Sequence, residues 1–379
     1  MSADRPLTVV SVMTTESSGG AEFAAVELLD AFVARGNRAI LLTNKPELRR
    51  ETAVATRPVD LGPKLSRSTY RRLFARAPRL ALRFRRALER ECPYDALLVH
   101  YKKEQLLTLT LPGSGGPLIV WAEWGPVPFE FRTGPPNWLY RRAAGRADLV
   151  LAISNGTRHS LIDAGVPAEK VVVLPNAVRA DEIRFTESGR AAVRERLGIP
   201  EDAFVVGCVS RFHPKKRNDI VVEAVKALPG AHLILAGSGE TEGELRALAA
   251  SIAERAHFLP TPTSDVAEVY SAFDVSVFCP SPTEGAPRAV ILAMFAERAV
   301  LSTGAEGVTE LLEHGGWIVA PENDSEALAE SLTRLRDDPA QRERLGIEGK
   351  QQVEQRHAAP VVAERLEVLL RDCLRRRAR

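Results

Sequence analysis

The sequence predicts an α/β protein that contains two doubly wound parallel sheets. Three observations lead to this prediction. Short apolar runs alternate with segments of helical periodicity along the whole chain. Glycine-containing loops follow several of these runs, as they do where a parallel strand leads into a helix. The chain has 379 residues, too many for one ordinary hydrophobic core, so two domains are expected.

The first domain is expected over residues 1–180. Residues 7–13 form an apolar run typical of a buried strand, and residues 39–43 form the next strand. Between them, residues 22–35 have the helical spacing of Val26, Leu29 and Val33. This βαβ unit implies a parallel sheet covered by helices. Further strands are predicted at residues 96–99, 118–121, 149–153 and 171–174.

The second domain is expected over residues 181–355, after a boundary near residues 177–200. Its strands are predicted at residues 205–209, 232–236, 257–259, 275–278, 299–302 and 316–319. In both domains a ligand is expected at the carboxyl ends of the strands. Residues 356–379 contain a final helix with a stripe of Val362, Leu366, Leu369 and Leu370 that could pack on either domain.

Composition and charge exclude several classes of protein. No apolar run reaches the roughly 18–20 residues needed to span a bilayer. Four scattered cysteines without a C-x-x-C pair argue against zinc and against a disulfide framework. We therefore expect a cytoplasmic protein. The net charge of +2 divides unevenly: residues 1–180 hold 26 Lys and Arg against 17 Asp and Glu, and the remainder holds 25 against 32. The first half is expected to meet an anionic partner.

A basic segment at residues 67–90 is the strongest local charge feature. It is helical in outline, with a break at Pro78 and one apolar stripe made of Leu73, Ala77, Leu80, Phe84 and Leu88. Arginines fill most of the remaining positions. Such a segment either lies peripherally on an anionic membrane, here the inner face, or forms a solvated outer helix over the core. Without an aromatic-rich recognition motif, nucleic acid is not expected as a partner.

Three loops that follow predicted strands have the residues of an anion site. Gly19 and Gly20 precede the first helix, where backbone N–H groups and the helix dipole attract phosphate. Arg211 and Lys216, after the strand at 205–209, are suited to clamping a diphosphate. Gly237 begins a Gly-Ser-Gly loop that lacks the third glycine of a dinucleotide fingerprint, so a nicotinamide cofactor is discounted. The simpler alternatives are that Gly19 and Gly20 form only a tight turn and that Arg211 and Lys216 lie in a solvated basic loop.

The turn at residues 284–289 leads directly into an apolar helix. Glu284 can accept hydrogen bonds from sugar hydroxyls, and Gly285 allows a ligand to approach the backbone. Ala286, Pro287, Arg288 and Ala289 complete the turn, with proline in the first turn of the helix.

Two polar residues end strands of the first domain and are candidate catalytic groups. His100 follows the strand at 96–99, and Glu123 lies in WAEWGP after the strand at 118–121. Either could act as a polar contact or a base. Residues of this kind at strand ends are also common structural hydrogen-bonding groups.

The order of these elements resembles the retaining GT-B glycosyltransferases of family 4, the glycosyl transferases group 1. The resemblance rests on GGAE at residues 19–22, the segment 147–178, SRFHPKK, LILAGSGE and SPTEGAPRAV. It implies two Rossmann-like domains that face each other across a cleft, and a C-terminal helix that crosses back to the first domain. It also implies a nucleotide-sugar donor bound mainly by the second domain and an acceptor held by the first.

The resemblance also assigns roles to particular residues. Arg211 and Lys216 match the family's diphosphate-binding pair, Glu284 matches the first Glu of its E-x7-E motif, and Gly19 and Gly20 match the glycines near the donor phosphates. Residues Phe258, Leu259 and Thr261 fall where the family contacts the nucleobase. The sequence departs from the family at Leu292, where the second Glu is expected and usually binds the ribose. Glu306 and Glu310 are better candidates to replace it than Glu297, and Glu310 matches a glutamate that is often seen in the family. Glu123 stands near the place of a family histidine, and His100 is a less certain match for it.

The function expected from these features is a metal-independent, retaining transfer of a hexosyl group from a nucleotide-diphosphate sugar, with UDP-sugar as the favoured donor. No cofactor is expected. The acceptor is left open among a natural product, a saccharide and a lipid-linked saccharide. Two alternatives are kept: a nucleotide-sugar epimerase, and an inactive homologue that acts as a binding subunit and is suggested by Leu292.

Overall fold

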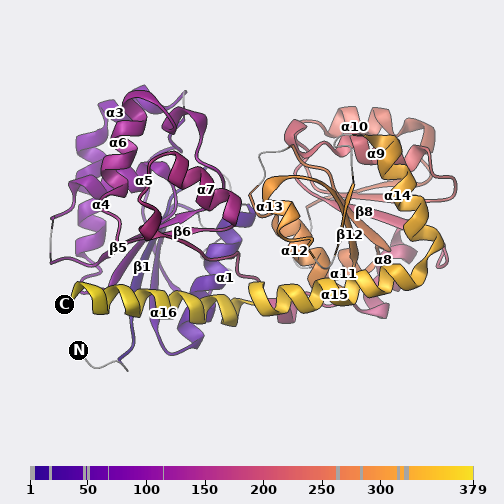
Figure 1. The fold of residues 1–379 in the computed structure, drawn as a ribbon. Coiled ribbons are helices and arrows are strands. Elements are labelled where there is room, and N and C mark those ends of the chain that lie inside the picture. Colours follow the sequence, from indigo (N-terminus) through magenta and orange to yellow (C-terminus); the bar gives the residue numbers. More distant parts are fainter. Residues whose placement is uncertain are drawn as a thin grey trace. The chain divides into compact units, whose positions relative to one another are not determined.

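The computed structural model describes residues 5–16, 19–45, 48, 52–66, 68–113, 115–261, 265–281, 285–313, 316–319 and 324–378. The chain divides into two compact units. Unit 1 comprises Met1–Val178 and Ala359–Arg379, and unit 2 comprises Arg179–Ala358 (Figure 1). Among the helices of these described ranges, none is long and apolar enough to span a bilayer.

Unit 1 contains a seven-stranded parallel sheet in the order β3-β2-β1-β4-β5-β6-β7. Its strands are β1 (Thr8–Met13), β2 (Arg38–Thr43), β3 (Ala55–Pro58), β4 (Ala96–Val99), β5 (Leu118–Glu123), β6 (Leu149–Ala152) and β7 (Val171–Val173). The helices are α1 (Gly20–Ala34), α3 (Tyr70–Ala75), α4 (Ala77–Glu89), α5 (Lys102–Leu107), α6 (Gly134–Ala144), α7 (Asn155–Asp163) and α16 (Ala359–Arg377).

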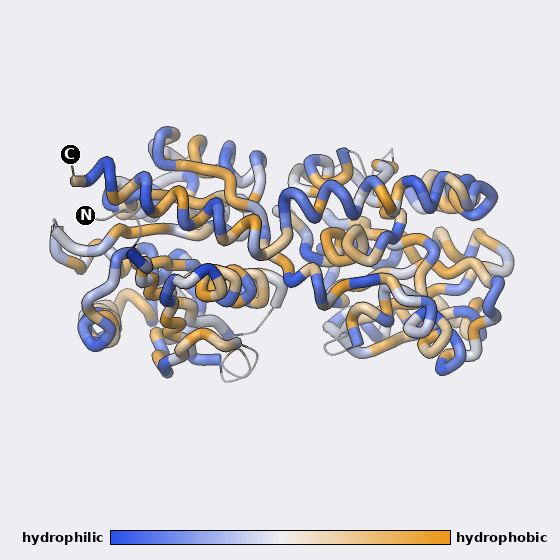
Figure 2. Tube along the Cα trace, turned by 90° about the horizontal axis from the view of Figure 1, so that it is seen from below, coloured by the Kyte–Doolittle hydropathy of each residue, from blue (hydrophilic) through white to orange (hydrophobic). Residues whose placement is uncertain are grey.

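Helices cover both faces of this sheet. One face packs against α1 and α16, which contact each other closely. Hydrophilic and hydrophobic residues alternate along α16, as Figure 2 shows, because one stripe of this helix enters the core. The other face packs against α3, α4 and α6, through residues such as Phe84 and Tyr140. The sheet is therefore the middle of three layers, which explains why its central strands are mostly apolar.

Unit 2 contains a six-stranded parallel sheet in the order β10-β9-β8-β11-β12-β13. Its strands are β8 (Val205–Val209), β9 (His232–Ala236), β10 (Ala256–Leu259), β11 (Val275–Phe278), β12 (Ala299–Thr303) and β13 (Gly316–Val319). The helices are α8 (Glu187–Leu197), α9 (Asn218–Lys226), α10 (Glu242–Leu248), α11 (Val266–Ser271), α12 (Arg288–Phe295), α13 (Glu306–Thr309), α14 (Ser325–Asp337) and α15 (Pro339–His357).

Both sheets therefore have the doubly wound strand order, and the predicted fold class is confirmed. In each, the strand order reverses between the first and the fourth strand, which are β1 and β4 in unit 1 and β8 and β11 in unit 2. Crevices at the carboxyl ends of such strand pairs are the usual ligand sites of this architecture.

At the amino edge of each sheet, an aspartate links two neighbouring strands. Asp95 precedes β4 and accepts the backbone N–H of Thr8 at 2.8 Å, and Asp274 precedes β11 and accepts the N–H of Val205 at 2.7 Å. Each carboxylate thus ties the fourth strand of its sheet to the first strand at the end opposite the expected ligand site. Arg5 also pairs with Asp95.

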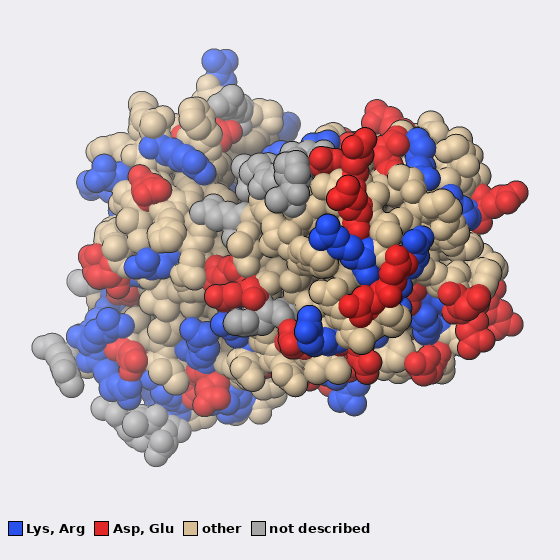
Figure 3. Space-filling view, turned by 45° about the vertical axis from the view of Figure 1, so that its right-hand side comes forward, with Lys and Arg blue, Asp and Glu red and all other residues tan. Residues whose placement is uncertain are grey.

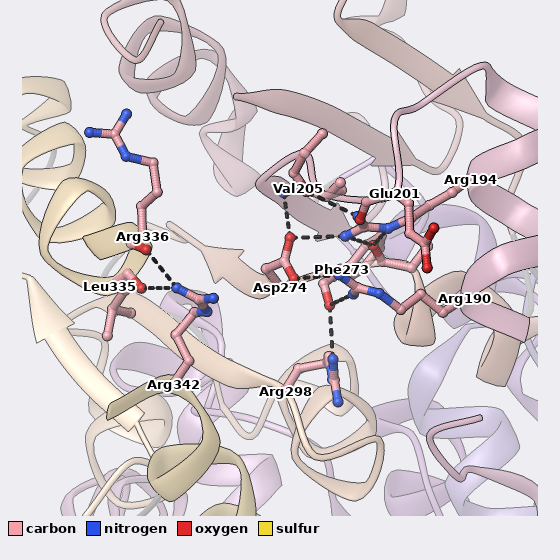
Figure 4. Close-up of polar contacts among 12 residues, drawn as sticks. Arg190, Arg194, Glu201, Val205, Phe273, Asp274, Arg298, Leu335, Arg336 and Arg342 are labelled. Carbon is pink, nitrogen blue, oxygen red and sulfur yellow. Dashed lines mark hydrogen bonds and ion pairs between the residues drawn. The ribbon is translucent and has the colours of Figure 1, made fainter. Parts of the chain in front are cut away.

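Arginines surround the Asp274 carboxylate (Figure 4). Arg190 and Arg194 each donate to it at 2.9 Å. Arg298 donates to the carbonyl oxygen of Phe273 at 3.0 Å, and burial lowers the pKa of its guanidinium to about 10. These contacts join α8, the start of β8, the start of β11 and the segment after α12 into one polar cluster, which fixes the amino edge of the second sheet.

The basic segment has the expected break, but the break does not fall at Pro78. The segment forms α3 and α4, and the break falls at Arg76, while Pro78 lies in the first turn of α4. Proline is compatible with this position because the first helical N–H groups have no intrahelical partner. Four of the five residues of the expected apolar stripe, Leu73, Leu80, Phe84 and Leu88, are buried in the core of unit 1, and Ala77 is half-buried.

Candidate functional site

The candidate site of unit 2 lies where β8 and β11 end side by side at the switch in strand order. The loops that follow β8, β9 and β10 are joined there by backbone hydrogen bonds. The N–H of Phe212 donates to the carbonyl of Ser238 at 2.9 Å, and the N–H of Gly237 donates to the carbonyl of Leu259 at 3.0 Å. This places Arg211, Gly237 and the start of the loop after β10 on one edge of the sheet.

Two glycines are required for this close packing of loops. A Cβ on Gly237 would lie 1.9 Å from the carbonyl oxygen of Ser210, and one on Gly239 would lie 2.2 Å from that of Phe212. Gly239 also has a φ of +155°, which L side chains rarely adopt. The Gly-Ser-Gly loop therefore lets the loop after β8 pass directly over the end of β9.

Lys216 brings a positive charge to the switch point. Its ammonium nitrogen lies 5.0 Å from the ring centroid of Phe278, the last residue of β11, although Lys216 itself belongs to the loop after β8. The loops after β8 and β11 are also linked by the N–H of Ser281, which donates to the carbonyl of Lys215 at 2.8 Å. Arg211 is exposed at the same edge. Two cations thus flank the place where an anionic ligand is expected.

Asn218 anchors this basic loop and is not among the residues predicted from the sequence. The side chain is buried, and its Oδ1 accepts the hydroxyl of Ser210 at 2.9 Å, next to Arg211. The Nδ2 of Asn218 has no hydrogen-bond partner among the residues that the structure describes. Its place at the first position of α9 was visible in the sequence, but its partner is set by the fold.

The turn before α12 packs against α13. Glu284 lies outside the described residues, and Gly285 is buried. A Cβ on Gly307, in α13, would lie 0.9 Å from the carbonyl oxygen of Gly285, so only glycine at position 307 allows this approach. Pro287 is the N-cap residue of α12, Arg288 and Ala289 form its first turn, and the hydroxyl of Tyr270 donates to the carbonyl of Ala289 at 3.0 Å.

Leu292 and Glu310 have different surroundings. Leu292 lies one turn into α12 and is 8% exposed, among buried apolar residues of the same helix. Glu310 follows α13 and is half-buried, and Ala286, in the turn before α12, is half-buried as well. The packing of Gly285 on Gly307 therefore brings the turn before α12 close to α13, the helix that Glu310 directly follows.

The residues expected near a nucleobase lie at the end of β10. The ring of Phe258 meets that of Phe212 edge-on, with centroids 6.3 Å apart, and the guanidinium of Arg246 lies 4.3 Å from its centroid. Leu259 is half-buried and Thr261 is exposed. Phe212 thus contacts both the loop after β9 and the aromatic end of β10.

In unit 1, His100 is buried beside the end of β1. The indole N–H of Trp124 donates to Nδ1 of His100 at 3.2 Å, and Nε2 lies 2.8 Å from the hydroxyl of Ser11. Because an indole nitrogen can only donate, the proton of the neutral imidazole is on Nε2, which donates to Ser11. Burial lowers the pKa of His100 to about 3. Both ring nitrogens are therefore engaged inside unit 1.

Glu123, the last residue of β5, is also internally paired. Its carboxylate accepts hydrogen bonds from Lys102 at 2.5 and 2.7 Å, from the hydroxyl of Tyr140 at 3.0 Å and from Gln105 at 3.0 Å. Glu123 is 4% exposed. Burial lowers the pKa of Lys102 and raises that of Tyr140. These contacts describe a buried charge pair that joins β5, α5 and α6.

A second carboxylate occupies the start of α1. Glu22 accepts the N–H of Gly19 at 2.9 Å through one oxygen and the hydroxyl of Tyr101 through the other, and Lys64 lies 3.5 Å from it. Gly20 is the first residue of the helix. A phosphate bound at the N–H of Gly19 would have to displace Glu22, a contact that the capping-box pattern of GGAE could have indicated.

Two family models match the chain, one in each half. Residues 189–352 match the model described as glycosyl transferases group 1, and residues 18–182 match the model described as glycosyltransferase family 4. Together they account for most of the chain, so the resemblance stated from the sequence is confirmed.

Curated relatives show the same likeness over part of their length. A GDP-mannose-dependent monoacylated alpha-(1-6)-phosphatidylinositol monomannoside mannosyltransferase of Corynebacterium glutamicum is 30% identical over 214 residues, which are 52% of this chain and 55% of the relative. The alpha-D-kanosaminyltransferase of Streptomyces kanamyceticus is 28% identical over 228 residues, which are 57% of this chain and 58% of the relative. The chain thus spans about half the length of the curated relatives it matches.

Solved structures match along nearly the whole chain. HepE of Anabaena in complex with UDP and glucose superposes with a TM-score of 0.80 and 19% identity, over 96% of this chain and 99% of HepE. Sucrose-phosphate synthase of Thermosynechococcus elongatus gives a TM-score of 0.80 and 20% identity, over 98% and 100% of the two chains. At these identities the likeness shows the fold, which is GT-B.

Proposed function

We propose that this chain, whose two halves match the models described as glycosyl transferases group 1 and glycosyltransferase family 4, transfers a hexosyl group from a nucleotide-diphosphate sugar to an acceptor hydroxyl with retention of configuration and without a metal ion. We propose a UDP-sugar as the donor, because HepE, which shares the fold, was solved with UDP and with UDP-glucose. The acceptor class is a natural product, a saccharide or a lipid-linked saccharide.

The observation that carries this proposal is the pair of cations at the switch point of unit 2. Lys216 lies above the end of β11 and Arg211 is exposed beside it, in a loop fixed by Asn218 and by the loop after β9. Charges held in advance at the place where a leaving group gains negative charge lower the barrier without reorganisation. Both side chains are therefore assigned to the diphosphate.

The proposed reaction needs no protein nucleophile. The bond between C1 of the sugar and the diphosphate oxygen breaks while a bond from C1 to the acceptor oxygen forms on the same face. The acceptor proton passes to the departing diphosphate, whose charge Arg211 and Lys216 stabilise. The turn at residues 284–289 would orient the sugar, since positioning alone lowers the barrier substantially.

Calorimetric titration with UDP, GDP, ADP and dTDP, followed by their hexose conjugates, tests the assignment. Lys216→Ala should weaken binding of the preferred nucleotide by roughly 10- to 150-fold, as expected for the loss of a charge-assisted hydrogen bond worth about 1.5–3 kcal/mol. Lys215→Ala is the matched control, because its exposed side chain belongs to the same loop. Equal affinities in the two variants would remove Lys216 from the site.

Two further measurements address the stereochemistry and the metal. The anomeric coupling constant of the product, compared with that of the donor sugar, distinguishes retention from inversion. Turnover in the presence of EDTA should equal turnover in its absence. Inversion, or a rate restored only by a divalent cation, would contradict the corresponding part of the proposal.

Leu292 favours one second candidate, an inactive homologue. The family position that usually offers a carboxylate to the ribose is here a buried leucine. Failure of every nucleotide in the panel to bind would support this candidate. Binding of one nucleotide together with turnover on any acceptor would exclude it.

A further inference from the structure

The outer face of α3 and α4, in unit 1, has a composition that points to a binding partner. The apolar stripe expected from the sequence, including Leu80, Phe84 and Leu88, is turned into the core against one face of the sheet. That stripe is therefore not available to a membrane. What faces solvent is a different set of residues, and their composition is unusual.

Arginines dominate this outer face. Residues 70–88 contain seven arginines and no acidic residue. The side chains of six arginines in α3, α4 and the adjoining turns make no hydrogen bond or ion pair with any residue that the structure describes: Arg72, Arg76, Arg79, Arg85, Arg86 and Arg90. All six are exposed. An isolated outer helix gains nothing in stability from so many unpaired like charges, which repel one another.

Large apolar side chains stand among these arginines. Tyr70 is 43% exposed, Phe74 is 53% exposed and Leu82 is 49% exposed. Tyr70 and Phe74 are four residues apart on α3 and so share one side of that helix. Leu82 lies opposite the buried stripe of α4, between Arg79 and Arg86, which are three residues before it and four residues after it on the same side of the helix.

We propose that this face of α3 and α4 docks unit 1 on an anionic lipid bilayer. The arginines would contact the headgroup phosphates, and Tyr70, Phe74 and Leu82 would enter the boundary between headgroups and acyl chains. Arginine suits this geometry because its aliphatic stem can lie along apolar surface while the guanidinium reaches polar groups. A soluble polyanion would satisfy the arginines but would leave the three apolar side chains in water, so the bilayer fits the face better.

The inference goes beyond the proposed function and does not depend on it. It concerns helices on one face of the first sheet, whereas the nucleotide is assigned to loops of unit 2. Docking and nucleotide binding can therefore be measured separately. A protein that docks without binding any nucleotide would refute the proposed function and leave this inference intact.

Co-sedimentation with vesicles tests the inference on the full-length chain. Phosphatidylcholine vesicles are compared with vesicles that also contain phosphatidylglycerol. The variant Arg72→Gln/Arg76→Gln/Arg79→Gln/Arg86→Gln should lose binding to the anionic vesicles by roughly fivefold for each arginine removed. The matched control replaces four exposed arginines of unit 2 by glutamine: Arg184, Arg196, Arg344 and Arg356. It changes net charge equally and should bind as the parent protein does.

The apolar part of the face has its own test. The double variant Phe74→Ser/Leu82→Ser keeps every arginine, and it should release from anionic vesicles at a lower salt concentration than the parent, because only the electrostatic attraction remains. In a Cys92→Ser background, an environment-sensitive dye on Leu82→Cys should shift to the blue when anionic vesicles are added. Cys92 is replaced because it is the exposed cysteine of the described residues.

Three results would overturn the proposal. One is an equal loss of binding in the arginine variant and its control, which would place the attraction outside this face. Another is a dye that does not respond although the protein sediments with the vesicles. The third is binding to single-stranded polynucleotide without binding to vesicles, which would identify the partner as a soluble polyanion. Circular dichroism of each variant establishes that the fold is retained.

Discussion

His100 provides a sharp test of whether a strand-end histidine in unit 1 has a structural or a chemical role. Its ring is stacked on Trp124, with centroids 5.7 Å apart and planes 13° apart, and both of its nitrogens are engaged. Burial lowers its pKa to about 3, against an ordinary value near 6.5 in the unfolded chain. We therefore expect the imidazole to stay neutral in the folded protein throughout the physiological pH range.

The consequence for stability follows from proton linkage. Because the folded pKa is the lower one, the unfolded state binds a proton first as the pH falls below about 6.5, and the folded state is destabilised until the pH approaches 3. At pH 4.5, about two pH units below the unfolded value, the expected loss is on the order of 3 kcal/mol at 1.36 kcal/mol per unit. Above pH 7 the histidine should contribute no pH dependence.

Denaturant unfolding followed by tryptophan fluorescence measures this loss. Three of the four tryptophans, Trp121, Trp124 and Trp138, lie in unit 1, and Trp317→Phe removes the one in unit 2. His100→Gln should flatten the dependence of unfolding free energy on pH between 6.5 and 4.5. The carboxylates that both proteins share contribute equally to the two slopes, so the difference between the slopes reports on His100. Protonated imidazole quenches a stacked indole, so the folded parent should show no quenching of Trp124 between pH 8 and 5. A quenching transition near pH 6.5, with a matching inflection in turnover that His100→Gln abolishes, would refute the reasoning.

Three further predictions follow from other buried groups. Glu123→Gln should lower the free energy of unfolding by about 3–5 kcal/mol, because it leaves the ammonium of Lys102 buried without its partner, and Glu123→Gln/Lys102→Met should recover part of that loss in a double-mutant cycle. A loss of turnover without a loss of stability would instead make Glu123 a chemical group. Asp274→Asn should cost about 3–5 kcal/mol in denaturant unfolding, since Arg190 and Arg194 lose their shared carboxylate; a change below about 1 kcal/mol would show that the cluster in Figure 4 is dispensable. Leu292→Glu should lower the melting temperature, because burying a carboxylate costs at least about 2 kcal/mol of unfolding free energy. Tighter nucleotide binding at an unchanged melting temperature would instead show that a carboxylate at this position can reach the ribose.

The strands were predictable because most of them are continuous apolar runs that helices cover on both sides. The segments at 96–99, 205–209, 232–236, 275–278 and 316–319 are strands with the predicted bounds. The strand β3 was missed because Ala55–Pro58 lies at the edge of its sheet and none of its four residues is buried, so it lacks the apolar signal. The sequence predicts the break at Pro78, but it does not show whether a proline lies within a helix or, as here, in its first turn.

The candidate site was predictable only to the level of single loops. The position of Lys216 after a strand indicated an anion site. Its placement over Phe278 depends on β8 and β11 being neighbours, although 65 residues separate the end of β8 from the start of β11 along the chain. The same limit applies to Glu123. Its partners Lys102 and Tyr140 lie on helices that precede and follow β5, and no local pattern connects the three. The sequence does not distinguish a charged residue at a strand end that binds a ligand from one that pairs with another part of the same domain.

The charge at the two switch points differs, and this difference supports the assignment of the nucleotide to unit 2. In unit 1 the start of α1 is capped by the carboxylate of Glu22, and the end of β1 contacts the buried carboxylate of Glu104, which accepts hydrogen bonds from Thr14. In unit 2 the corresponding place has Arg211 and Lys216. On the face of unit 2 drawn in Figure 3, acidic and basic side chains are interspersed.

A diphosphate entering unit 1 at the first helix would meet a carboxylate and would have to replace it, whereas in unit 2 it would meet two cations at the carboxyl edge of the sheet. Replacing a carboxylate by a phosphate at the same N–H groups exchanges one anion for another and so gains little. A phosphate placed near Lys216 and Arg211 would instead accept charge-assisted hydrogen bonds from both cations. The two units share one strand order, and the difference in charge at their switch points gives them different capacities to bind an anion.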